Sequence, residues 1–174
     1  MNIKVTKLDA ARRQLTTAIE LWFQDGDPVA IHTLAYAAHE IVHRLFRQRG
    51  LKDLLFDSGV VKEERRKEFN LLLKESANFL KHAERDSKED DAIDFETFGN
   101  DLFIIMTLEG LRRMEEKLKP VELAFLVWQS LNTSYLAPGL VQQNIPVEIL
   151  EQFRAIKRSE FLKIFLKSWK WDDE

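Results

Sequence analysis

The chain has 174 residues, of which 45% are hydrophobic and 32% are charged, a balance typical of a folded, water-soluble protein. Its formal net charge of −3 gives no overall positive field, so nucleic acid is not favoured as a partner. It contains no cysteine, which excludes disulfides, thiolate catalysis and cysteine-ligated zinc, and we expect a cytoplasmic protein. No run of about 18 apolar residues occurs, so no membrane span is expected.

Two long helices are expected at the start of the chain. Apolar residues recur every three or four positions between Lys7 and Gln24, which predicts the first helix. Asp27 is the predicted N-cap of the second helix, with Pro28 at its first position, and Gly50 is the predicted C-cap. The second helix is therefore expected to have about 22 residues.

Two more helices are expected in the middle of the chain. An apolar turn over residues 51–56 and the breaker Asp57-Ser58-Gly59 precede the third, whose apolar positions recur between residues 69 and 83. The acidic segment 85–94 has no apolar period, so we expect a solvated loop there. The fourth helix is expected over 97–118 and is apolar nearly all round, as a central helix is.

The last third of the chain is expected to be helical as well. Pro120 opens a fifth helix over 121–131, and Pro146 opens a sixth over 147–157. A final stretch follows Ser159. No segment shows the two-residue alternation of a strand.

The final stretch is amphipathic. Its aromatic residues recur four apart on one side and its lysines lie on another: Phe161, Phe165 and Trp169, and Lys163, Lys167 and Lys170. We expect its apolar side to dock on the bundle. A self-association surface that includes Trp171 is the alternative.

These patterns predict an all-α, single-domain bundle of about six helices over residues 1–174. Residues 1–118 are expected to form the core. The helices within residues 119–174 are expected to pack on that core.

All four histidines lie on the second and third predicted helices: His32, His39, His43 and His82. At about 100° per residue, the three on the second helix fall within about 40° and flank its apolar stripe. The segment from His39 through Glu40 to His43 reads H-E-x-x-H. In that pattern two imidazoles one turn apart bind zinc and the glutamate activates the bound water.

A zinc site needs a third protein ligand, and residues 44–49 supply no histidine. His82 is the preferred third ligand, and Glu109 is another if packing brings it close. His32 stands about 10 Å along the helix axis from His39, too far to share an ion. The alternative is that the imidazoles are half-buried at helix seams and hydrogen-bond to one another, to Tyr36 or to carboxylates.

The segment Ala77-Asn78-Phe79-Leu80-Lys81-His82 places Asn78 and His82 on one helix face. Together with the order of the first four expected helices, this segment makes residues 7–117 or so resemble the HEPN superfamily of helical bundles. The phrase from Asn78 to Asp86 is also similar to one shared by a group of bacterial proteins. The resemblance implies a HEPN-like four-helix core with a C-terminal extension.

In HEPN ribonucleases the signature is an arginine, usually followed by a polar residue, and then a histidine four to six positions after the arginine. By the resemblance, Asn78 and His82 match the polar residue and the histidine, while Ala77 takes the place of the arginine. Alanine cannot neutralise a phosphate, so the resemblance implies a non-catalytic binding module or a degenerate ribonuclease.

We therefore expect a non-enzymatic binding module that self-associates or binds another protein, through a seam formed by Asn78, His82, Tyr36 and His32. One enzymatic alternative is a metal-dependent hydrolase, with zinc on His39, His43 and His82 and with Glu40 as general base. The other is a degenerate ribonuclease that uses His82.

Overall fold

The computed structural model describes residues 2–59, 61–81, 92–133 and 147–168. Within these ranges every regular element is helical and no strand occurs, which confirms the all-α prediction. The elements are α1 (Lys7–Phe23), α2 (Pro28–Gln48), the 3-10 turn η1 (Leu55–Asp57), α3 (Glu63–Lys81), α4 (Phe98–Arg113), α5 (Pro120–Asn132), α6 (Val147–Ala155) and α7 (Arg158–Ser168). The predicted acidic loop over 85–94 lies largely outside the described residues.

The first two helices begin at side-chain caps. The Asp9 backbone N–H donates to Thr6 Oγ1 at 3.1 Å, and the Asp9 carboxylate accepts from the Thr6 backbone N–H in return. At α2 the Asp27 side chain accepts from the Ala30 N–H at 2.8 Å, just before Pro28. This confirms the predicted start of the second helix.

The fourth helix is shorter than predicted, because it ends at Arg113 and not near Leu118. Glu115 adopts a left-handed conformation with φ of 62°. The Glu116 N–H then donates back to the Leu111 carbonyl at 3.0 Å, which closes the helix end. No glycine or proline marks this position, so the sequence pattern did not reveal it.

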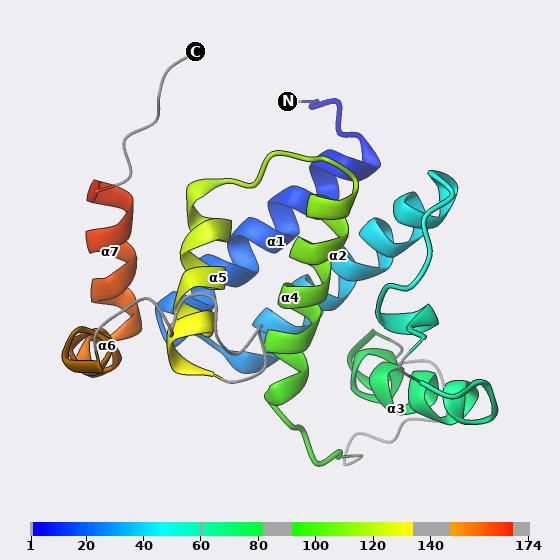
Figure 1. Cartoon of the computed structure of the whole chain (residues 1–174). Helices are drawn as coiled ribbons and strands as arrows, with labels where there is room; N and C mark the ends of the chain where they lie inside the picture. The colour runs from blue at the N-terminus through cyan, green and yellow to red at the C-terminus, as the bar shows by residue number, and fades with distance from the viewer. Residues whose placement is uncertain (1, 60, 82–91, 134–146, 169–174) are drawn as a thin grey trace.

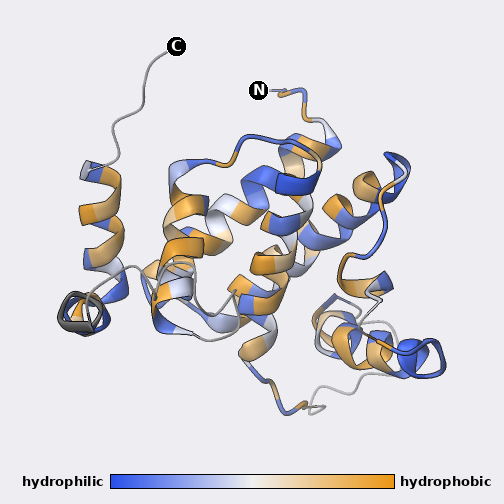
Figure 2. Ribbon diagram, viewed as in Figure 1, coloured by the Kyte–Doolittle hydropathy of each residue, from blue (hydrophilic) through white to orange (hydrophobic). Residues whose placement is uncertain are grey.

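The core lies among α1, α2, α4 and α5. α1 packs along α2, α2 packs along α4, and α5 packs against α1 (Figure 1). Apolar residues recur along each of these helices (Figure 2), and most of the residues buried between them are apolar. Their largest buried apolar side chains are Leu15, Ile19, Phe23, Tyr36, Phe46, Phe103, Ile104, Leu108, Leu111 and Phe125.

The last two helices, α6 and α7, pack on this core, which includes α5 in addition to helices from residues 1–118. α7 contacts α5 and α1, and α6 contacts α5. Phe161 of α7 is buried, with its ring centroid 6.3 Å from that of Phe23 and 5.0 Å from that of Trp128. The predicted alternative use of Trp171 in self-association falls outside the described residues.

Helices α2 and α4 run parallel and approach closely at Gly110. A Cβ atom at this position would lie 2.8 Å from Val42 Cγ1 and 3.0 Å from Leu54 Cδ2. Val42 is β-branched and stiff, so it has little freedom to move aside. The missing side chain at Gly110 is therefore what allows the two helices to touch.

Replacing Gly110 by alanine is expected to lower the free energy of unfolding by about 1 to 2 kcal/mol, because overpacking outweighs the better helix propensity of alanine. Gly99→Ala on the same helix is the matched control, since its Cβ would meet its nearest atom, His32 Cε1, at an ordinary 3.4 Å. Urea unfolding of both variants measures the difference. Equal stabilities would show that the α2–α4 contact yields to a methyl group.

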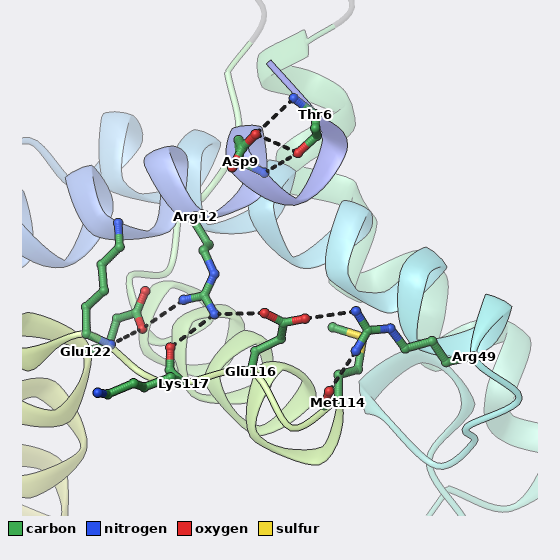
Figure 3. A network of polar contacts seen from close by, with 9 residues as sticks. Thr6, Asp9, Arg12, Arg49, Met114, Glu116, Lys117 and Glu122 are labelled. Atoms are coloured by element: carbon green, nitrogen blue, oxygen red, sulfur yellow. Dashed lines mark hydrogen bonds and ion pairs between the residues drawn. The ribbon is translucent and has the colours of Figure 1, made fainter. Parts of the chain in front are cut away.

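A network of charged side chains joins α1 and the end of α2 to the connection between α4 and α5 (Figure 3). Arg12 Nη2 lies 3.3 Å from Glu116 Oε2 and donates to the Lys117 carbonyl at 3.1 Å, while Arg12 Nη1 lies 3.5 Å from Glu122 Oε2. Arg49 Nη2 contacts Glu116 Oε1 at 2.8 Å. Glu122 is fully buried, so Arg12 supplies its nearest opposite charge inside the protein.

Candidate functional site

Two polar residues of α4 meet two of the histidines of α2. His32 Nδ1 lies 2.9 Å from Asn100 Oδ1, and His39 Nδ1 lies 3.4 Å from Thr107 Oγ1. Each pair spans 68 positions in the sequence, and the partners on each helix are seven residues, two turns, apart. The parallel packing of α2 and α4 therefore produces two polar contacts stacked along one apolar seam.

His32 is buried and held neutral in the first of these contacts. Asn100 Nδ2 donates to the Pro28 carbonyl at 2.9 Å, so Asn100 Oδ1 faces His32 as an acceptor and His32 Nδ1 carries the proton. Burial lowers the pKa of His32, the bond to Asn100 opposes this, and the charge of Lys81 adds to the lowering. His32 fixes the start of α2 against α4. Its side chain is buried, whereas the predicted binding role requires an exposed side chain.

His39 is the more enclosed of the two predicted zinc ligands that the structure describes. The Thr107 hydroxyl donates to the Phe103 carbonyl at 2.6 Å, so its oxygen faces His39 Nδ1 as an acceptor at a long 3.4 Å. His39 Nε2 is buried and has no hydrogen-bond partner. Burial, and after it the charge of His43, lowers the pKa of His39 to about 3. The prediction that this side chain flanks the apolar stripe is wrong, because it lies inside the core.

His43 lies nearer the surface and has a weak acidic partner. Its Nδ1 is 3.9 Å from Asp57 Oδ1, beyond hydrogen-bonding distance, and makes no hydrogen bond. Burial lowers the pKa of His43, the charge of Asp57 raises it, and the charges of Arg47 and Lys74 lower it further. His43 is thus half-buried at a seam, as the alternative to zinc binding predicted, but its Nδ1 lacks the hydrogen bond that this alternative expected.

The aromatic ring of Phe56, from η1, packs against both imidazoles of the H-E-x-x-H segment. Its centroid lies 4.9 Å from that of His39 and 5.2 Å from that of His43, and the two imidazole centroids are 6.0 Å apart. Among the residues that the structure describes, no group of three or more histidine, aspartate or glutamate side chains is placed to hold a metal ion. The described residues therefore do not fit a zinc ion, and the third predicted ligand, His82, lies outside them.

The predicted general base, Glu40, is engaged elsewhere. Its Oε1 accepts from the Tyr36 hydroxyl at 3.1 Å and its Oε2 lies 2.9 Å from Lys81 Nζ, which also sits 4.2 Å from the centre of the Tyr36 ring. Burial and the neighbouring Glu40 charge raise the pKa of Tyr36. Tyr36, Glu40 and Lys81 together fasten the C-terminal end of α3 to α2.

The predicted seam between α2 and α3 is not formed by Asn78. Ala77 is buried and faces the bundle, whereas Asn78, the next residue round the helix, is exposed. The small side chain of Ala77 lets α3 approach the body, and a rotation of about 100° per residue then turns Asn78 to solvent. His82 lies outside the described residues, so the ribonuclease alternative stays a prediction.

Sequence reasoning missed the partners of the histidines. Asn100 and Thr107 are the polar residues on the buried, otherwise apolar side of α4. Their seven-residue spacing equals that of His32 and His39. This matched spacing was the available signal. Nothing in the sequence pattern places the ring of Phe56 against the imidazoles, because η1 reaches them only through tertiary packing.

No family model matches the chain, and neither a curated protein nor a solved structure matches it. Membership of the HEPN superfamily, the cytoplasmic location and the partner of the chain therefore stay predictions. Within the described residues, the helices are too short or too polar for any of them to cross a membrane.

Proposed function

We propose that the chain is a non-enzymatic protein-interaction module that self-associates through the side of α3 facing away from the bundle. The observation that carries this proposal is the exposure of large apolar residues on a single helix. Leu71 and Leu72 are 60% and 64% exposed, and Phe79 is 38% exposed. Such residues gathered on one element are typical of an interaction surface.

Few side chains of helix α3 are buried against the rest of the chain. All of its residues are described, and Ala77 is the one that is buried; Phe69 and Leu73 are partly buried against the core. A helix of this length is marginal in water unless packing covers an apolar face. Covering Leu71 and Leu72 in a partner interface would therefore stabilise α3 as well as the complex.

Polar contacts fix the direction in which α3 faces. Asn70 Nδ2 donates to the Phe56 carbonyl at 3.0 Å, and Arg66 Nη1 donates to the Ser58 carbonyl at 3.0 Å. At the other end Lys81 pairs with Glu40. These contacts tie α3 to η1, to the residue that follows η1 and to α2, so the exposed apolar residues of α3 are presented on a positioned helix.

The geometry supports the interaction module better than the hydrolase. A catalytic zinc site keeps an open position for substrate, whereas His39 is enclosed by aromatic rings and Glu40 is paired with Lys81. A ribonuclease would need a cation at the position of Ala77, which is instead a buried methyl group. Neither chemistry uses the exposed apolar residues of α3.

Replacing Leu72 by glutamate is expected to weaken the self-association by at least about 10- to 100-fold, because each copy loses a leucine side chain buried in the interface. Sedimentation velocity of the parent and the variant measures this. Leu166→Glu is the matched control, since Leu166 of α7 is also exposed, and it should associate like the parent. A parent chain that stays monomeric at high concentration, or equal dissociation by both variants, contradicts the proposal.

A further inference from the structure

A basic groove with an apolar floor lies beside the second half of α2. It has a volume of about 490 Å³ and is lined by Lys7, Glu40, Ile41, Arg44, Leu45 and Gln48; we call it the α1–α2 groove. Ile41 and Leu45 are partly buried and form the apolar part of the lining. Lys7 and Arg44 are exposed and form no ion pair with another described residue.

The one acid in this lining is already neutralised. Glu40 pairs with Lys81 at 2.9 Å, so the remaining rim of the α1–α2 groove is positive. Arg47, which is exposed beside Arg44 and Gln48, extends the positive surface around the helix. An acidic partner with an apolar centre would match both the charge and the floor of this groove.

The outward side of α3 has that composition. At about 100° per residue, six side chains fall within an arc of about 100°. Three are the apolar residues of the proposed interaction surface and three are exposed acids between them: Leu71, Leu72 and Phe79, and Glu64, Glu68 and Glu75. We call this set the α3 ridge. Glu64 and Glu75 form no ion pair with another described residue, and Glu68 has a loose, exposed contact of 3.6 Å with Arg65.

We propose that the α3 ridge of one copy of this chain packs into the α1–α2 groove of a second copy, with Glu68 and Glu75 facing Lys7 and Arg44. This inference rests on the proposed function and names the counter-surface for it. The ridge supplies the leucines and the acids, and the groove supplies the apolar floor and the bases. The second copy is therefore the occupant that fits both surfaces.

The helix that carries the ridge also ends beside the groove. Lys81 at the C-terminal end of α3, on its bundle-facing side, contacts Glu40 in the lining of the groove. A two-fold axis near this junction places each ridge in the groove of the other copy at once. The resulting interface is closed and leaves no free ridge or groove for filament growth.

A charge-swap experiment tests this pairing. The variants are Lys7→Glu with Arg44→Glu, Glu68→Lys with Glu75→Lys, and all four changes in one chain. Each double variant should weaken the dimer about tenfold or more, because like charges then face each other across the interface. The fourfold variant should return to within about threefold of the parent, since the pairs are restored with opposite sign.

Lys163→Glu with Lys167→Glu on α7 is the control for Lys7→Glu with Arg44→Glu, because it makes the same change in net charge at exposed lysines away from both surfaces. It should leave the dissociation constant unchanged. A fourfold variant weaker than either double variant, or double variants that associate like the parent, would overturn the inference. If Leu72→Glu dissociates the dimer while the charge variants do not, the proposed function stands and only the α1–α2 groove is wrong; a monomeric parent overturns both.

Discussion

Replacing Arg12 by methionine is expected to lower the free energy of unfolding by about 3 kcal/mol at neutral pH, because it leaves the buried Glu122 carboxylate without its ion-pair partner. Glu122 is fully buried, and its Oε1 has no hydrogen-bond partner. Burial raises the pKa of Glu122, and the Lys119 backbone N–H, Arg12 and the Lys119 charge oppose this rise. Without Arg12 the pKa of Glu122 rises further, so the lost stability grows as the pH is raised.

Two further variants separate this effect from lost packing. Glu122→Gln in the Arg12→Met background removes the buried charge, retains an acceptor for the Lys119 N–H, and should recover most of the stability. Arg49→Met is the control, because Arg49 contacts the same Glu116 but its side chain is 45% exposed, and it should cost about 1 kcal/mol or less. Urea unfolding at pH 6 and pH 8 measures all three. An Arg12→Met loss no larger than the Arg49→Met loss would contradict the account.

A second large effect is expected in acid, and it comes from His39. The pKa of His39 is about 3 in the folded chain and near its ordinary value of 6.5 in the unfolded chain. Between these values the unfolded chain binds a proton that the folded chain does not, so stability is lost as the pH falls below 6.5. From pH 7 to pH 5 this loss amounts to about 2 kcal/mol.

His39→Leu isolates this contribution. Leucine fills a similar space and leaves the Thr107 hydroxyl bonded to the Phe103 carbonyl, so we expect a change within about 1 kcal/mol at pH 7. The pKa values of His32 and His43 are also lowered, but both histidines are present in the parent and in the variant, so their contribution cancels in the comparison. The drop in unfolding free energy from pH 7 to pH 5 should therefore be about 2 kcal/mol smaller in the variant. Equal drops would mean that His39 titrates freely in the folded chain.

The helical architecture followed from local sequence signals where those signals exist. Apolar spacing and the Asp27-Pro28 start were enough to place α1 and α2 to within about two residues. The end of α4 was not predictable in this way, since Glu115 takes a left-handed conformation that sequence pattern associates with glycine. Helix ends of that kind depend on the surrounding packing.

The spacing of apolar residues could not predict how deeply the histidines are buried. Spacing placed His32, His39 and His43 on one arc, but it did not distinguish a flank from the core. His39 is enclosed because Phe56 and Phe103 come from distant parts of the chain to cover it. The same limit explains Asn78, whose exposure depends on which side of α3 meets the bundle.

The chemistry that a short motif can perform therefore depends on how deeply its side chains are buried. The H-E-x-x-H spacing puts His39 and His43 one turn apart in any helix, but zinc chemistry also requires a third ligand and an open position. In this bundle His39 packs at the seam between α2 and α4, and His43 packs against Phe56 of η1. The surface that we propose for function is the outward side of α3, together with the α1–α2 groove that complements it.

The most direct test of this account is the protonation of His39 in the folded chain, measured by two-bond ¹H–¹⁵N NMR correlation from pH 7.5 to pH 5. We expect a neutral ring with its proton on Nδ1 and no titration across this range, in the parent and in the dissociated Leu72→Glu variant alike. A His39 ring that titrates near pH 6.5 would contradict it, because the imidazole would then be open to solvent and available for the chemistry of the H-E-x-x-H motif.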